Sequence, residues 1–191
     1  KVDVKIKRGK EKELLEFTIE RDKIPIYSVD ASYMASPKVG YIKLNNFSAS
    51  SVSEIKKAVY TLKAEGMKDL ILDLQNNGGG YLMTAVELVD QFLSEPKLVV
   101  STKGRSFPEK KFQTRQNGLL ENGRLVVLVN ESSASASEIV SGAIQDWDRG
   151  LIVGRRTFGK GLVQKPINLP DGTQARITTS KYYTPSGRCI Q

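Results

Sequence analysis

The chain has 191 residues, of which 39% are hydrophobic and 26% charged, a composition typical of a globular domain. It contains no histidine, which excludes a Ser-His-Asp triad and the usual histidine-rich zinc sites. A single cysteine excludes an internal disulfide, and no run approaches the roughly 18 apolar residues of a membrane span. The chain begins at Lys1 without an initiator methionine or an apolar signal segment, so we expect an excerpt of a longer protein.

The N-terminal 21 residues predict a β-hairpin. Val2, Val4 and Ile6 alternate with polar residues, a charged turn surrounds Gly9, and the alternation resumes at Leu15. Six of the first twelve residues are Lys or Arg, and with the net charge of +8 they raise the alternative of a nucleic-acid-binding module. No aromatic residue is interleaved among them, which favours a strand with a solvated basic face.

The next segment predicts a strand, a helix and a second strand. Residues 24–37 read as a connector with prolines near both ends, and residues 39–44 as a strand. Ser50 or Ser51 caps a helix that runs to about Glu65 and stops at Gly66. The apolar run within residues 67–74 predicts a buried strand, so the order suggests a sheet with crossover connections.

Three glycines, Gly78 to Gly80, follow that strand directly and precede an amphipathic helix at residues 82–93. Their N–H groups are unobstructed by side chains, so the turn can hold an oxyanion. The alternative is a tight structural turn without a chemical role, because glycine-rich strand-to-helix turns are common.

The remaining chain continues the α/β order. Residues 98–100 and 125–129 predict strands, and the polar segment 103–123 between them predicts a surface hairpin or loop without chemistry. A helix then runs from about Ala134 to Asp146 and ends at Gly150. It is followed by a strand at residues 151–153 and a hairpin of residues 164–167 and 173–183 around Pro170-Asp171-Gly172.

Ser135 and Lys160 are the candidate reactive pair. Without histidine, a serine nucleophile needs another base, and a lysine serves when its surroundings favour the free amine. Ser135 is expected in the first helical turn, where the N–H of Ala136 can hold an oxyanion. Lys160 lies between two glycines that allow close approach of a substrate.

Three alternatives compete with this interpretation. The serines at 132–137 can be helix-capping residues, and Lys160 can be one of many solvated lysines. Residues 154–160 also match the first seven positions of a phosphate-binding P-loop. However, Gly161 stands where a P-loop places Ser or Thr, and no helix is evident after Lys160.

Four blocks in this sequence resemble the C-terminal processing peptidases, also called tail-specific proteases. They are Asp73 to Gly80, Ser133 to Ile139, Phe158 to Gln164 and Tyr182 to Arg188. The resemblance implies that Ser135 is the nucleophile, Lys160 the general base and Gln164 the residue that orients the lysine. It also implies that Gly79 and Gly80 join Ala136 in the oxyanion hole. Gly78 departs from the family pattern, since many members carry proline there.

The same resemblance implies the fold and the setting. We expect an α/β core like that of crotonases and Clp peptidases over residues 25–191, and a truncated PDZ hairpin over residues 1–24. The implied activity is serine endopeptidase cleavage of polypeptides with exposed C-termini, without metal, cofactor or nucleic acid. Family members work in the bacterial cell envelope or in chloroplasts, which implies a periplasmic or membrane-associated protein, and homo-oligomers are an open expectation.

Supporting polar contacts are expected from Asp73, Glu138, Asp146 and Thr157, without a role in proton transfer. Glu138 lies in the first turn of the helix after Ser135, where a carboxylate stabilises backbone donors and the helix dipole. A catalytically silent peptide-binding or scaffold fragment remains the alternative to an active enzyme.

Overall fold

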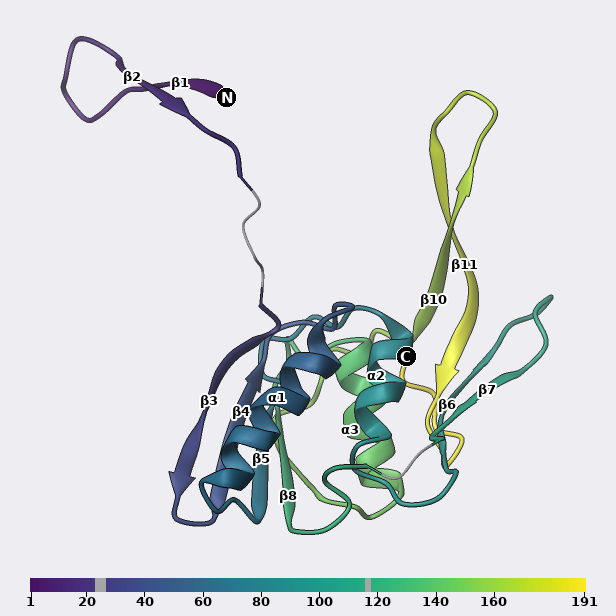
Figure 1. The fold of residues 1–191 in the computed structure, drawn as a ribbon. Coiled ribbons are helices and arrows are strands. Elements are labelled where there is room, and N and C mark those ends of the chain that lie inside the picture. The colour runs from purple at the N-terminus through teal and green to yellow at the C-terminus, as the bar shows by residue number, and fades with distance from the viewer. Residues whose placement is uncertain (23–26, 116–117) are drawn as a thin grey trace.

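A computed structural model describes residues 1–22, 27–115 and 118–191 of the chain (Figure 1). Its central element is a five-stranded sheet of order β3-β4-β5-β8-β9, in which β3 pairs antiparallel with β4 and the other pairs are parallel. The strands are β3 (Val29–Ser36), β4 (Val39–Leu44), β5 (Asp69–Asp73), β8 (Leu125–Val129) and β9 (Leu151–Gly154).

Three helices connect the parallel strands and cover one face of this sheet (Figure 1). They are α1 (Ser51–Ala64), α2 (Leu82–Val89) and α3 (Ala136–Asp146). Parallel strands require such crossovers because the chain has to return to the starting edge before the next strand begins. The hydrophobic core fills the space between sheet and helices, with Ile42, Leu72 and Val127 from the sheet and Ile144 from α3 fully buried.

A second sheet is antiparallel and has the order β10-β11-β6-β7. Its strands are β6 (Leu98–Lys103), β7 (Lys110–Gln113), β10 (Leu162–Asn168) and β11 (Gln174–Tyr183). It packs against α2 and α3 through β6, whose Val99 and Val100 are fully buried. The Trp147 indole N–H donates to the Leu98 carbonyl at 2.7 Å and ties the end of α3 to β6.

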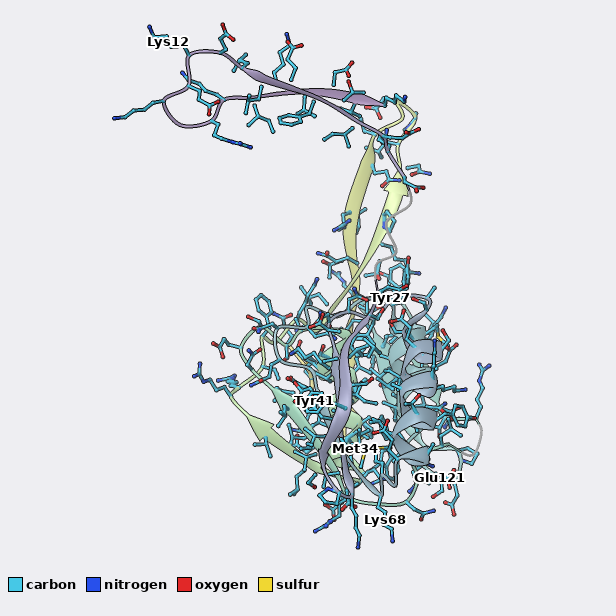
Figure 2. All side chains as sticks on the ribbon, turned by 60° about the vertical axis from the view of Figure 1, so that its left-hand side comes forward. Lys12, Tyr27, Met34, Tyr41, Lys68 and Glu121 are labelled. Carbon is cyan, nitrogen blue, oxygen red and sulfur yellow. The ribbon has the colours of Figure 1, made fainter. Side chains whose placement is uncertain are left out.

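A separate two-stranded sheet is formed by β1 (Val2–Ile6) and β2 (Leu15–Ile19). Figure 2 shows Lys12 at the tip of this hairpin. The predicted hairpin is confirmed, with Val2 opposite Ile19 and Val4 opposite Phe17. Among the described residues, no helix combines the length and apolarity needed to cross a membrane.

Most predicted elements are confirmed, but three predictions are wrong. The helix predicted over residues 82–93 ends at Val89, because the N–H groups of Gln91 and Phe92 donate only three residues back, to Leu88 and Val89. The proposed connector at 24–37 contains β3 from Val29 onwards, because this segment pairs with β4 along its length; residues 24–26 lie outside the described residues. Helix α3 ends at Asp146, as the predicted run does, with Trp147 as its C-cap. The stop expected at Gly150 is wrong, because Asp148 already takes a left-handed conformation with φ of 50°. Lys160 is followed by strand β10 and not by a helix, which contradicts the P-loop alternative.

The parallel strands place their following loops together. Strands β4, β5 and β8 end at the same edge of the sheet, so the chain after Leu44, Asp73 and Val129 meets there. Sites in α/β sheets form at this carboxyl edge. The glycine turn follows β5 and the serine cluster follows β8, so both lie at this edge.

Candidate active site

Ser135 occupies a sharp turn between β8 and α3. It is the N-cap residue of α3, with φ of 55° and ψ of −109°, so it precedes the first helical turn in which the sequence placed it. A non-glycine residue in such a region costs on the order of 1–3 kcal/mol and persists only where its surroundings enforce it. Ala136 follows as the first helical residue, and its N–H has no partner within the helix. The turn therefore presents a serine hydroxyl beside an amide that has no hydrogen-bond partner within its own helix.

The glycine turn packs directly on Ser135. A Cβ added at Gly79 would lie 2.8 Å from the Ser135 Cβ and 2.9 Å from the Ala136 nitrogen, so only glycine permits this approach. Gly79 has φ of 97°, a conformation that favours glycine as well. Its own N–H donates to the Asn77 side-chain oxygen at 2.9 Å and is already engaged.

Gly80 is oriented by a bridge to Phe47. The Phe47 N–H donates to the Gly79 carbonyl at 3.0 Å, and the Tyr81 N–H donates to the Phe47 carbonyl at 2.8 Å. In a parallel bridge these two bonds use the residues on either side of Gly80, so the Gly80 N–H points away from Phe47. A Cβ at Gly80 would lie 2.1 Å from the Phe47 carbonyl oxygen, which explains the glycine.

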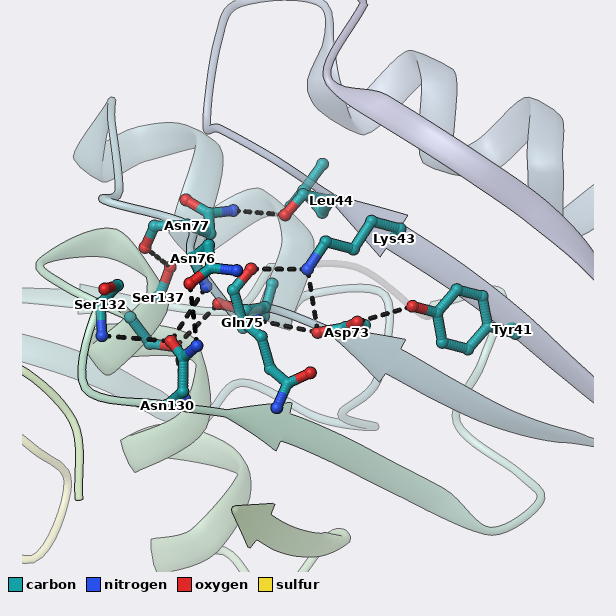
Figure 3. A network of polar contacts seen from close by, with 12 residues as sticks. Tyr41, Lys43, Leu44, Asp73, Gln75, Asn76, Asn77, Asn130, Ser132 and Ser137 are labelled. Atoms are coloured by element: carbon teal, nitrogen blue, oxygen red, sulfur yellow. Dashed lines mark hydrogen bonds and ion pairs between the residues drawn. The ribbon is translucent and has the colours of Figure 1, made fainter. Parts of the chain in front are cut away.

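Buried polar groups lock the glycine turn to the serine turn. The Asn77 carbonyl accepts from the Ser137 hydroxyl at 2.9 Å and from the Ala134 N–H at 3.0 Å. The Asn77 side chain also donates to the Leu44 carbonyl at 2.8 Å, and the Asn77 residue is fully buried. Figure 3 shows these contacts converging from β4, from the chain after β5 and from α3.

Asn130 forms a second link between the two turns. Its side-chain oxygen accepts from the Asn76 N–H at 3.0 Å, and its side-chain nitrogen donates to the Asn76 side chain at 2.9 Å (Figure 3). Asn76 has φ of 61°, a left-handed conformation that asparagine tolerates. This reciprocal pair fixes the start of the glycine turn against the start of the serine turn.

A buried charged group supports the glycine turn from the other side of the sheet. Asp73 accepts from the Tyr41 hydroxyl at 2.6 Å and from the Gln75 N–H at 2.7 Å, and pairs with the Lys43 ammonium at 3.2 Å (Figure 3). Lys43 also donates to the Gln75 carbonyl. Figure 2 shows Tyr41 on the side of the sheet opposite α1. Burial, together with the adjacent Asp73 carboxylate, raises the pKa of Tyr41 well above its ordinary value.

Glu138 joins the serine turn to the lysine loop. One of its carboxylate oxygens accepts from both the Ser135 N–H and the Lys160 N–H, each at 2.8 Å, and the other accepts from the Gly159 N–H at 2.6 Å. Glu138 is 4% exposed, so these charge-assisted bonds lie away from solvent. The backbone N–H groups of Ser135 and Lys160 therefore donate to the same oxygen atom, which brings the two backbones close together.

The lysine loop itself is more open. Lys160 is exposed, and the loop is further fixed by the Phe158 N–H, which donates to the Ser133 carbonyl at 3.0 Å. A Cβ at Gly161 would lie 2.3 Å from the Gln191 nitrogen, so the last residues of the chain pack on this glycine. Gln164 is exposed on β10, and within the described part of the chain its side chain makes no hydrogen bond.

The predicted site residues thus fall into three groups. Ser135, Ala136, Gly79 and Gly80 lie together; the Lys160 backbone joins them through Glu138; and Gln164 lies on the adjoining strand. In the described ranges, no group of three or more His, Cys, Asp or Glu side chains could hold a metal ion.

Two asparagines that organise the site received no role from the sequence. Asn77 lies within the block Asp73 to Gly80, and Asn130 lies outside the four blocks. The sequence does contain a signal for Asn130. This residue directly follows strand β8, and Asn76 and Asn77 lie shortly after the end of strand β5. Carboxyl ends of adjacent parallel strands meet at one edge, so amides in both positions are within reach of each other.

Comparisons with known proteins show the family to which the chain is similar. The model of peptidase family S41 matches residues 38–191. A carboxyl-terminal-processing protease of Picosynechococcus sp. is 43% identical over 148 residues, covering 78% of this chain and 35% of the relative. One from Synechocystis sp. is 41% identical over 174 residues, covering 89% of this chain and 40% of the relative.

A solved structure shows the same fold. A photosystem II D1 C-terminal processing protease superimposes with a TM-score of 0.79 at 31% identity, covering 94% of this chain and 49% of that protein. The chain thus spans less than half the length of these relatives. On the match that covers both sequence blocks around Ser135 and Lys160, the chain belongs to peptidase family S41.

Proposed function

We propose that this chain is the catalytic core of a serine endopeptidase that cleaves polypeptides near exposed C-terminal tails. Ser135 acts as the nucleophile and Lys160 as the general base. The observation that carries the proposal is the single Glu138 carboxylate oxygen that accepts from the backbones of both residues. This shared acceptor supports the proposal that the Ser135 hydroxyl and the Lys160 amine act at one site. The names of the similar relatives support the C-terminal tail as substrate.

The reaction proceeds through an acyl-enzyme. Lys160, as the free amine, takes the proton from the Ser135 hydroxyl while the oxygen bonds to the scissile carbonyl carbon. The N–H groups of Gly80 and Ala136 stabilise the oxyanion. The carbon–nitrogen bond then breaks as the Lys160 ammonium returns the proton to the leaving amine. Water, giving its proton to Lys160, attacks the ester, and collapse releases the acid and returns the proton to Ser135.

Other residues have supporting roles. The Gly79 amide is engaged by Asn77, so Gly79 contributes by allowing the close approach to Ser135 while Gly80 donates. Gln164 orients the Lys160 amine without adding charge. A polypeptide bound over the exposed Lys160 would exclude water from the site. No metal or cofactor takes part.

The wider setting is proposed by analogy with the family. Residues 25–191 form a crotonase- and Clp-peptidase-like core, and residues 1–24 are the last hairpin of a PDZ domain. The boundary between them falls at residues outside the described ranges. The full-length protein works in the bacterial cell envelope, in the periplasm or at the membrane, and homo-oligomers are compatible with this role.

Covalent labelling tests the assignment. We expect a small fluorophosphonate to attach to Ser135, as located by mass spectrometry of the digested protein. Ser135→Ala should abolish labelling and peptide cleavage, and Lys160→Ala should slow both by at least about a hundredfold because the base is lost. Ser132→Ala is the matched control, since Ser132 is an exposed serine of the same cluster. Cleavage by Lys160→Ala at the wild-type rate would contradict the proposal. Peptide binding without any labelling would instead support the silent scaffold.

A further inference from the structure

Strand β10 forms an edge of the antiparallel sheet next to the candidate active site. It begins at Leu162, two residues after Lys160, and pairs with β11 on one side. On its other side, no strand pairs with it within the described ranges 1–22, 27–115 and 118–191. An unpaired edge presents backbone donors and acceptors that can bind another extended chain.

The hydrogen bonds at both ends of the hairpin show which backbone groups face this open edge. At one end the Tyr182 N–H donates to the Gly161 carbonyl, and at the other the Leu169 N–H donates to the Thr173 carbonyl, both at 2.8 Å. Bonded and non-bonded pairs alternate along an antiparallel ladder. The register shifts between Val163 and Gln164, where β11 carries the extra residue Thr179, so the alternation along β10 itself is kept. Counting inward from the Gly161 end places Leu162, and counting from the Leu169 end places Gln164, in non-bonded pairs with β11. Their N–H and C=O groups therefore point to the open edge.

Pro166 has the same orientation, two residues beyond Gln164. Proline has no N–H, and proteins use it on edge strands to prevent unwanted pairing. Here it interrupts the row of donors after Gln164. The part of the edge that can accept a strand at full strength is thus limited to the stretch adjoining Lys160.

We propose that the open edge of Leu162–Gln164 binds the main chain of the polypeptide substrate as an added β-strand. This inference rests on the proposed peptidase function and names how that site holds its substrate. Main-chain pairing recognises an extended segment regardless of its side chains. Only two outward-facing residues precede Pro166, so the pairing is short and holds the part of the substrate that lies beside Lys160.

Proline scanning of the edge tests the proposal in the full chain. Gln164→Pro removes one outward N–H, and Pro166 shows that this strand accepts proline in that orientation. We expect KM for a peptide substrate to rise roughly threefold to tenfold relative to Gln164→Ala, the value of one hydrogen bond. The rate at which a small fluorophosphonate labels Ser135 should be equal in these two variants. Gln164→Ala isolates the side chain, which has its own proposed role.

Asn168→Pro is the matched control, because Asn168 has the same orientation but lies beyond Pro166. It should leave KM unchanged. Peptide substrates carrying one backbone N-methyl group at successive positions should show a similar loss at one position near the scissile bond.

Three outcomes would overturn the inference. They are equal KM values for Gln164→Pro and Gln164→Ala, tolerance of N-methylation at every position, or a loss of thermal stability in Gln164→Pro alone with KM unchanged. The last result would mean that the edge is paired within the protein. Failure of the wild-type protein to label at Ser135 would instead contradict the proposed function itself.

Discussion

The serine half and the lysine half of the candidate site are supported very differently. Around Ser135, buried side chains of Asn77 and Ser137 and the Asn76–Asn130 pair join two loops through several hydrogen bonds. The lysine loop is exposed at Lys160 and is held to α3 by the Glu138 carboxylate. Segments with few buried contacts open most easily. The comparison indicates a serine turn held by many buried hydrogen bonds, and a lysine loop held to α3 mainly by Glu138, with a further bond from the Phe158 N–H to the Ser133 carbonyl.

The largest effect is expected from Glu138→Ala. The substitution leaves the N–H groups of Ser135, Gly159 and Lys160 without their acceptor. We expect kcat/KM for peptide cleavage to fall at least about a hundredfold and the free energy of unfolding to drop by about 2–4 kcal/mol. Hydrogen exchange should accelerate at Gly159 and Lys160 while the amide of Gly79 stays protected.

Two further variants sharpen this test. Glu138→Gln keeps the shape but loses the charge, so its effect should be intermediate. Glu131→Ala removes an exposed partner of Arg155 and should change stability by less than about 1 kcal/mol. Equal exchange of Gly79 and Lys160 in Glu138→Ala would show that the two halves do not differ in support.

A smaller loss of activity is expected when the ion pair between Lys43 and Asp73, which lies behind the glycine turn, is removed. Lys43→Met leaves the Asp73 carboxylate, 5% exposed, without its ammonium partner. We expect a loss of about 2–3 kcal/mol in the free energy of unfolding, measured by urea titration. Activity should remain within about tenfold of wild type, because Asn77 and Asn130 still hold the glycine turn.

Lys5→Met is the control for the charge change. Lys5 pairs with Glu16, but both side chains are more than half exposed, so the effect should stay below about 1 kcal/mol. If Lys43→Met abolished activity as fully as Glu138→Ala, the remaining hydrogen bonds of the serine half would not be sufficient to hold it, and the proposed difference between the two halves would be wrong.

The smallest effect is expected at the other end of α3 and depends on pH. Burial raises the pKa of Asp146, but hydrogen bonds from Thr184, Ser186 and Arg188 outweigh it and hold the pKa below the ordinary 3.8. A lowered pKa stabilises the fold fully above pH 3.8, and that contribution is lost as the pH falls through the folded value. Asp146 fixes the turn that precedes Ile190 and Gln191, which pack on the lysine loop.

Asp146→Asn should therefore lower the melting temperature slightly at pH 7, by an amount equivalent to about 1 kcal/mol. Its melting temperature should also fall less than that of wild type between about pH 5 and pH 3. Asp148→Asn serves as the control, because asparagine tolerates the left-handed conformation at that exposed position. If the melting temperature of Asp146→Asn depended on pH as that of wild type does, the Asp146 carboxylate would not be the group that stabilises this turn.

Local sequence patterns determined much of this protein. Alternating apolar residues and the cap and stop residues of α1 specify elements that depend on near neighbours, so β4 and α1 lie where the sequence predicts them. The blocks around Gly79, Ser135 and Lys160 also identified the candidate site, because their residue types suit a serine nucleophile and a lysine base. The alternation of apolar and polar residues in β3 is weaker, so the sequence predicts a connector there.

Only the tertiary structure decided how the site is held together. Glu138 reaches across 21 and 22 positions of sequence to the amides of Gly159 and Lys160, and Asn130 across 54 to Asn76. The left-handed φ of Ser135 occurs at the turn that these contacts hold, whereas the Gly79 amide is engaged locally by Asn77, two residues before it. Composition and periodicity report on the burial of neighbours along the chain, whereas a hydrogen bond between distant loops exists only after the strands are placed side by side.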